Sequence, residues 1–289
     1  MSLQSLIDRP VELLELINDC LKPKEKEKKE YGEVFTPISL INDMLDKLPE
    51  QVWTNKNLKW FDPASGMGNF MIVVYLRLMN SLKQEIIDDQ ERKKHILENM
   101  IYMSELNKKN VLICKQIFDI NNEFKLNLYQ GDTLKADFNQ IFNINKFDII
   151  VGNPPYQENT TGKRKGGYGG RALWEKFLLL VLDKLLIKQG YLVFVHPSSW
   201  RKPEHDLWYI MKSKQILYLE IHSKKEGNKT FQASVRYDWY VLQNIKNNKK
   251  TIIRDETGKI TNIDLRKLNF LPNYMIIEIA EITIDDTEE

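Results

Sequence analysis

A short polar segment, Asn153-Pro154-Pro155-Tyr156, directly follows the apolar run at residues 147–151. Two consecutive prolines make a rigid loop, which holds the Asn153 amide oxygen and the Pro154 carbonyl in fixed directions. Both groups are acceptors, so together they can take two N–H bonds from one amine, beside the aromatic face of Tyr156. Two such bonds favour the pyramidal form that an aromatic amine adopts as its lone pair attacks a methyl sulfonium. Catalysis of this kind depends on positioning and electrostatics and needs no metal. The segment therefore predicts Asn153, Pro154, Pro155 and Tyr156 as catalytic residues of an N-methyl transfer.

A Gly-x-Gly turn at residues 62–68 lies upstream, between a predicted strand and a predicted helix. It lacks a third glycine and the Gly-Lys-Ser/Thr of a phosphate-binding loop, which favours a smaller adenosyl cofactor over a dinucleotide. Glu105 ends the next predicted strand, where a carboxylate can accept hydrogen bonds from both ribose hydroxyls, or can simply be a solvent-exposed acid. Asp132 follows Gly131 and can accept from the cofactor's adenine amine, or equally cap the turn at Thr133.

Alternating helices and strands should position these residues. The expected strands cover residues 58–62, 100–105, 125–130, 147–151, 190–195, 215–221 and 235–243. The expected helices cover residues 37–48, 68–82, 86–98, 107–119 and 172–188. This order predicts an α/β fold of the Rossmann-like type, with a mainly parallel seven-stranded sheet and helices on both faces. The chemically suggestive residues all follow strand C-termini, which is the edge where such sheets bind ligands.

Composition narrows the classes of function. The chain has 289 residues and a net charge of +2, so no global basic field indicates nucleic acid, although the charge of one cleft can still bind it. No apolar run is long enough to span a membrane, and the start lacks a signal-peptide pattern. Cys20 and Cys114 are far apart, which favours reduced thiols in the cytoplasm, and no Cys/His cluster has metal-binding spacing.

Three segments are expected along the chain. Residues 1–30 comprise an amphipathic helix over residues 3–20 and a solvated charge run from Lys22 to Glu30. Residues 31–245 form the catalytic domain. Residues 246–289 form a short C-terminal extension with a turn at 255–258.

The order of the motifs resembles that of the γ-type adenine-specific DNA methyltransferases of restriction–modification systems. The likeness runs from about residue 31 to 243, and is carried by the segments 32–37, 62–70 and 153–156, with further likeness at 172–177 and 190–200. It implies a fold that binds S-adenosylmethionine and an enzyme that methylates N6 of adenine. It also implies that the cofactor is surrounded by Thr36, Pro37, Asp62, Ala64, Gly66, Glu105 and Asp132. Asn153, Pro154 and Tyr156 would hold the adenine.

Double-stranded DNA is the partner that this resemblance implies, and a base in a duplex must be flipped out to reach such a pocket. Tyr156 would then stack on one face of the base and Phe231 on the other, unless Phe231 is only a core or loop aromatic. Phosphate contacts are expected from Lys163, Arg164 and Lys165, and similarly from Arg201 and Lys202. For each cation the alternative is a solvated loop charge.

One departure from the family concerns target recognition. Relatives usually carry a large recognition domain after the catalytic domain, whereas only residues 246–289 remain here. We expect a reduced recognition region, a truncated chain, or a specificity subunit that acts as a partner. Two other functions stay open: an RNA guanine or protein-glutamine methyltransferase, which uses a similar Asn-Pro-Pro-Tyr loop, and a non-catalytic DNA-binding subunit on the same fold. The Phe35-Thr36-Pro37 segment and the form of the glycine turn favour adenine in DNA as the substrate.

Overall fold

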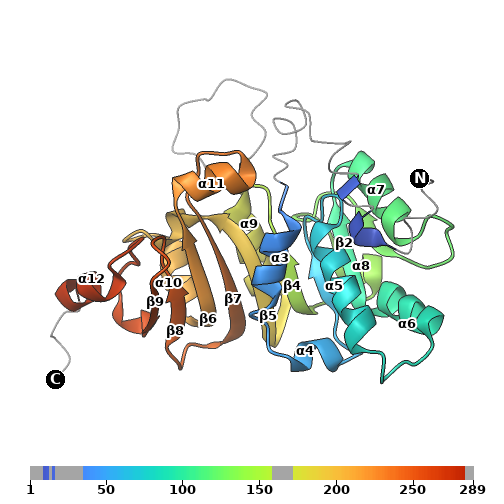
Figure 1. The fold of residues 1–289 in the computed structure, drawn as a ribbon, viewed down its shortest axis with the longest axis horizontal. Helices are drawn as coiled ribbons and strands as arrows, with labels where there is room; N and C mark the ends of the chain where they lie inside the picture. The colour runs from blue at the N-terminus through green and yellow to red at the C-terminus, as the bar shows by residue number, and fades with distance from the viewer. Residues whose placement is uncertain (1–8, 13–14, 17–34, 158–171, 284–289) are drawn as a thin grey trace. The chain divides into compact units, whose positions relative to one another are not determined.

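The computed structural model describes residues 9–12, 15–16, 35–157 and 172–283, and the chain divides into two compact units, Met1–Leu186 and Ile187–Glu289 (Figure 1). The expected helix at residues 3–20 and the charge run at 22–30 lie mostly outside the described residues. Each unit contains strands and helices, so the α/β class predicted from the sequence is confirmed.

The first unit is built on parallel strands in the order β3-β2-β1-β4. Their bounds are β1 Trp60–Asp62, β2 Ile101–Glu105, β3 Asn127–Gln130 and β4 Phe147–Gly152. Every residue of β1 and β2 is buried, as expected for parallel strands with helices on both faces. Trp60 and Phe61 of β1 are fully buried and form the centre of the core.

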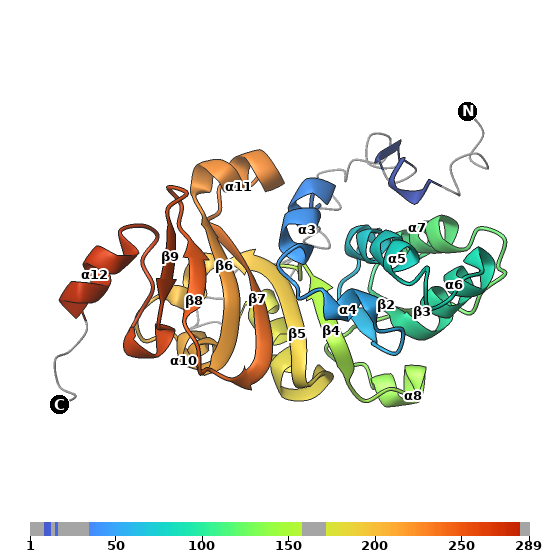
Figure 2. The same ribbon diagram turned by 60° about the horizontal axis from the view of Figure 1, so that its bottom comes forward.

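Helices cover both faces of these strands. Their bounds are α3 Ile38–Leu45, α4 Gln51–Thr54, α5 Asn69–Ser81, α6 Asp89–His95, α7 Lys108–Phe118, α8 Phe138–Phe142 and α9 Leu173–Leu180. The chain runs from β1 through β2 to β3 in one direction and then returns to β4, so right-handed crossovers place α5 and α7 opposite α8. Figure 2 shows these helices on opposite sides of the strands. Phe138 of α8 packs edge-on against Phe61 and Phe147, which anchors that face.

The second unit holds a mixed sheet in the order β5-β7-β6-β8-β9. Its strands are β5 Leu186–Pro197, β6 Lys214–His222, β7 Tyr237–Lys246, β8 Thr251–Arg254 and β9 Ile260–Ile263. Strand β7 is antiparallel to both β5 and β6, β6 and β8 are parallel, and β8 and β9 form an antiparallel hairpin. Its helices are α10 Asp206–Lys212, α11 Lys224–Phe231 and α12 Ile276–Thr283.

The prediction of seven mainly parallel strands needs correction. All seven expected strands are present, but the described residues contain nine, and only the first unit is wholly parallel. The two additional strands, β8 and β9, follow residue 245 and pair into the second unit's sheet. They are only four residues long, which is too short for a clear sequence periodicity. The expected turn between them is present, with Gly258 at φ +87° and its N–H bonded to the Asp255 carbonyl.

Candidate active site

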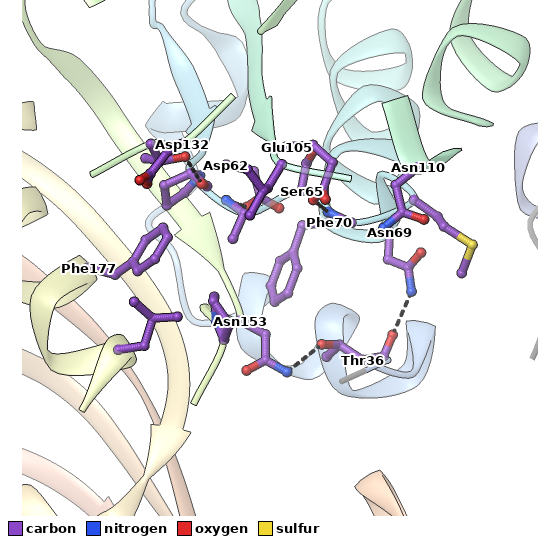
Figure 3. Close-up of a pocket in the computed structure, with 18 of the residues that line it drawn as sticks. Thr36, Asp62, Ser65, Asn69, Phe70, Glu105, Asn110, Asp132, Asn153 and Phe177 are labelled. Carbon is purple, nitrogen blue, oxygen red and sulfur yellow. Dashed lines mark hydrogen bonds between the residues drawn. The ribbon is translucent and has the colours of Figure 1, made fainter. Parts of the chain in front are cut away.

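One pocket of the first unit lies at the carboxyl ends of its four parallel strands (Figure 3). Asp62 ends β1, Glu105 ends β2, Asp132 follows β3 and Asn153 follows β4. The structure therefore brings together the residues that the sequence placed at strand ends. The pocket is lined by Phe35, Thr36, Asp62, Pro63, Ala64, Ser65, Gly66, Met67, Asn69, Phe70, Glu105, Leu106, Asn110, Gly131, Asp132, Thr133, Leu134, Asn153, Pro155, Gln157, Leu173 and Phe177.

The glycine turn between β1 and α5 needs both of its glycines. Gly66 and Gly68 have φ angles of +54° and +92°, in the left-handed region that other residues rarely adopt. A Cβ on Gly68 would also lie 3.0 Å from the Phe118 ring and 3.4 Å from the Cys114 sulfur, so this glycine lets α5 pack against α7. Cys114 lies beneath the turn and its thiol donates to the Gly66 carbonyl at 3.3 Å. Burial raises the pKa of this thiol, which keeps it neutral.

Glu105 braces the turn from the neighbouring strand. Its Oε2 accepts the Gly66 N–H at 2.8 Å, and its Oε1 accepts the Asn107 N–H at 2.7 Å. The residue is 8% exposed and lines the pocket. An ionised carboxylate only accepts hydrogen bonds, so it can bind hydroxyl donors as well as backbone N–H groups. This geometry is compatible with a diol, and the ribose role of Glu105 stays a prediction.

Asp62 is a buried acid in the same pocket. It is 1% exposed, and its Oδ1 accepts the Ala64 N–H at 3.0 Å. Burial raises the pKa of Asp62 to about 8, the Ala64 N–H opposes the rise, and the negative charge of Glu105 adds to it. A carboxyl in this state ionises readily when a cation binds beside it.

Side-chain bonds join the loops that follow β1 and β3 to strand β2. Thr133 donates from Oγ1 to the Pro63 carbonyl at 2.6 Å and shares a 2.6 Å bond with the Ser104 hydroxyl. Asp132 lines the pocket but caps the turn, because its Oδ1 accepts the Leu134 N–H at 3.1 Å. Its other oxygen lies 3.0 Å from the Lys135 amine. The structure thus contains the capping interaction that the sequence left as an alternative.

Asn153 faces the pocket from the loop after β4. Its Nδ2 donates to the Thr36 hydroxyl at 3.1 Å, whereas its Oδ1 is buried and has no hydrogen-bond partner among the described residues. Pro155 also lines the pocket, and Pro154 is buried beside it. A buried amide oxygen without a partner costs about 1–3 kcal/mol, so a ligand N–H that reached it would recover that free energy.

Several predicted residues lie elsewhere. Pro37 begins α3 as its N-cap residue, and Tyr156 is half-buried but is not among the residues that line the pocket. Phe231 belongs to the second unit, where it is buried and packs edge-on against Tyr237 at 4.8 Å. Lys163, Arg164 and Lys165 lie outside the described residues. The cofactor role of Pro37 and the DNA roles of the other residues stay predictions.

The prediction of a phosphate contact for Arg201 is wrong. Arg201 is 3% exposed, and its guanidinium donates to both carboxylate oxygens of Asp238 and to the Leu271 carbonyl at 2.7 Å. A buried guanidinium engaged in this way is not available to DNA, and removing its Asp238 partner would leave an uncompensated buried charge. The sequence could not reveal this, because Asp238 lies 37 residues further along the chain, on β7. Lys202, the next residue, is exposed.

The sequence reasoning missed part of the pocket wall. Asn69 and Phe70 open α5, and Asn110 comes from α7. Leu173 and Phe177 come from α9, where they are one turn apart on the same helix face. Spacing of four residues predicts a buried face, but it does not tell a pocket wall from a core. Figure 3 shows the Phe177 and Phe70 rings between the strand-end acids and Asn153.

Comparison with solved structures supports the fold. A chain from a type I restriction–modification system matches with a TM-score of 0.64 at 14% identity, over 87% of this chain and 50% of that one. At such low identity the likeness shows the fold alone, which is therefore the α/β fold found in a restriction–modification assembly. None of the helices in the described ranges has the length and apolar character needed to cross a bilayer.

The sequence comparisons define the family. The profile of the N-6 DNA methylase family matches residues 21–168, and the chain belongs to this family of adenine-specific DNA methyltransferases. An uncharacterized adenine-specific methylase of Mycoplasma pneumoniae is 26% identical, over 84% of this chain and 75% of that protein. The restriction enzyme and methyltransferase RM.Eco57I of Escherichia coli is 23% identical, over 68% of this chain but only 26% of its own length. The chain thus spans about half of the type I neighbour and a quarter of the E. coli relative.

Proposed function

We propose that this chain transfers a methyl group from S-adenosylmethionine to the N6 amine of a flipped-out adenine in double-stranded DNA. Family membership supports the reaction class. The observation that carries the assignment to this pocket is the Asn153 Oδ1, a buried acceptor without a partner among the described residues, in the same pocket as Asp62 and Glu105. An acceptor in that position suits an amine that must present two N–H groups as it reacts.

The residues of the pocket fit S-adenosylmethionine. Its cationic methionine end suits the buried Asp62 carboxyl, which ionises readily beside a positive charge. Its ribose hydroxyls suit the Glu105 carboxylate, which lines the pocket and can only accept when ionised, and the left-handed glycine turn allows close approach of the backbone. When bound, the cofactor supplies an electrophilic methyl group.

The chain's own residues orient the amine. Asn153 Oδ1 accepts one N–H of the adenine amine, and the Pro154 carbonyl is the second acceptor. The two bonds localise the lone pair on nitrogen and aim it, which is catalysis by positioning and by electrostatics. The methylated amine is cationic and acidic, so it then loses one proton to solvent water. Tyr156 supplies an aromatic face for the base, with Phe231 proposed as the other.

Recognition of a DNA sequence is proposed to need more than the described residues. Phosphate contacts are assigned to Lys163, Arg164 and Lys165. Because a structural neighbour comes from the complex of a type I restriction–modification system, we propose that a specificity subunit or recognition partner acts with this chain.

The test is methyl transfer from labelled S-adenosylmethionine to unmethylated duplex DNA, followed by digestion to nucleosides. We expect label in N6-methyladenine and none with an Asn153→Ala protein. Asn139→Ala is the matched control, since Asn139 is exposed on α8. The same assay is run in parallel with RNA and with protein as acceptors. Label in RNA or in protein glutamine, with none in DNA, would assign the pocket to one of these other substrates.

A further inference from the structure

Thr36 connects the cofactor side of the pocket to the target side. It is almost fully buried, and both its backbone and its side chain accept hydrogen bonds from asparagines. Asn69 of α5 donates from Nδ2 to the Thr36 carbonyl at 3.1 Å. Asn153 donates from Nδ2 to the Thr36 hydroxyl, also at 3.1 Å. Figure 3 shows both bonds converging on this residue.

The position of Thr36 is set by its neighbours. Pro37 follows it as the N-cap residue of α3, and the Pro37 carbonyl accepts the Ile41 N–H at 3.1 Å, which starts the helix. The Asn69 bond holds the Thr36 carbonyl from the other side. A carbonyl only accepts, so this bond also sets which end of the Asn69 amide faces Thr36. The Thr36 hydroxyl is therefore presented to Asn153 from a braced backbone.

The orientation of the Asn153 amide decides whether it can act. Its two ends differ in chemistry: Oδ1 accepts from an amine, whereas Nδ2 would meet the amine's N–H groups donor to donor. With Nδ2 bonded to Thr36, the oxygen is the end left without a partner among the described residues. An amide turned the other way would present no acceptor to the adenine.

We infer that Thr36 is a positioning residue, which holds the Asn153 side chain with its oxygen toward the target amine. The expected effect on the rate of methyl transfer rests on the proposed function. The expected orientation of the Asn153 amide does not. It differs from a role for Thr36 in binding the cofactor, which the family resemblance implies. The two roles separate in experiment, because positioning affects the rate of transfer and cofactor binding affects the dissociation constant.

The kinetic test compares Thr36→Val, which keeps the shape but loses the hydroxyl, with Thr36→Ser, which keeps it. We expect the single-turnover rate at saturating cofactor to fall about three- to tenfold in Thr36→Val, the worth of one neutral hydrogen bond. The rate should return to within about twofold of wild type in Thr36→Ser, where that bond is restored. The dissociation constant for S-adenosylmethionine should stay unchanged in both. A weaker cofactor affinity with an unchanged rate would overturn the inference.

A second comparison uses Asn153→Asp. A carboxylate has an acceptor oxygen at both ends, so it presents one to the amine however it turns. The loss caused by Thr36→Val should therefore shrink in the Asn153→Asp background. An equal loss in both backgrounds would mean that Thr36 supports the loop in general and does not orient the amide.

The structural readout needs no activity. In protein labelled with ¹⁵N-asparagine, the side-chain amide signals of Asn153 are identified by their disappearance in Asn153→Ser. We expect these signals to move upfield in Thr36→Val, since a donor has lost its acceptor, and to return in Thr36→Ser. Unmoved signals would overturn the inference. If the signals move in Thr36→Val but the wild-type protein methylates no DNA, the positioning role of Thr36 is sustained. The proposed function is then the part that is wrong.

Discussion

The two acids of the cofactor side and the amide of the target side differ in how their oxygens are satisfied. On the cofactor side, the Asp62 carboxyl accepts a backbone N–H of its own loop, and Glu105 accepts one from its own loop and one from the glycine turn. On the target side, the Asn153 oxygen is buried and has no partner among the described residues. The first arrangement builds a stable cradle before any ligand arrives. The second leaves an acceptor at high free energy, and that free energy is available to the reacting amine.

This difference separates binding from catalysis. Interactions that exist equally in the ground state and the transition state lower the dissociation constant, whereas those completed only during reaction raise the rate. Changes on the cofactor side should thus weaken affinity and stability together. Changes on the target side should slow transfer and leave both nearly intact.

Asn153→Ala should give the largest effect. Removing a preorganised electrostatic partner of a transition state typically costs about 10²–10³ in rate, and we expect a loss of this order in single-turnover methyl transfer. Affinity for S-adenosylmethionine, measured by calorimetry, should change less than about threefold, since the change removes no bond to the cofactor. A parallel loss of affinity would erase the distinction between the two sides.

Glu105→Gln should show the opposite pattern. The change keeps the shape but removes the charge that holds the Gly66 and Asn107 N–H groups. Charge-assisted bonds of this kind contribute about 1.5–3 kcal/mol, so the cofactor's dissociation constant should rise roughly 10- to 100-fold. The midpoint of thermal unfolding should fall as well. Unchanged affinity and unchanged stability would show that the brace is unimportant.

The pH dependence of cofactor affinity should report Asp62. Its pKa is raised to about 8, so it is mostly protonated at pH 7 in the free protein. A cationic ligand favours the carboxylate, so binding releases a proton and affinity should strengthen as pH rises from 6.5 to 8.5. The slope for one proton is at most about tenfold per pH unit. Asp62→Asn is the control, because the ligand's own amine titrates equally in both proteins. If affinity changed with pH by the same slope in both proteins, Asp62 would be excluded as the titrating group.

Asp132→Asn should give the smallest effect. Asp132 is 37% exposed, pairs with Lys135 and caps the Leu134 N–H. Asparagine also caps well, so the cofactor's dissociation constant should change less than about threefold. A loss greater than about thirtyfold, measured by the same calorimetry, would instead restore the direct role for this carboxylate that the sequence suggested.

The sequence was informative where function depends on local order along the chain. Helix–strand alternation and acids at strand ends were enough to predict that Asp62, Glu105, Asp132 and Asn153 share one edge of a parallel sheet, because parallel strands end together. Sequence reasoning was weaker where strands were short, as for β8 and β9, and where the sheet turned antiparallel in the second unit. Periodicity shows that a strand is buried, but not which neighbour it pairs with or in which direction.

The residue types and their order therefore determined the family, the glycine turn and the Asn-Pro-Pro-Tyr loop, since these depend on local backbone geometry. Only the tertiary structure decided which polar groups are satisfied. Arg201 is hydrogen-bonded to Asp238, 37 residues away in the chain, and Asn153 is hydrogen-bonded to Thr36, 117 residues away. A hydrogen bond depends on distances within a few tenths of an ångström, and spacing along a sequence carries no such information.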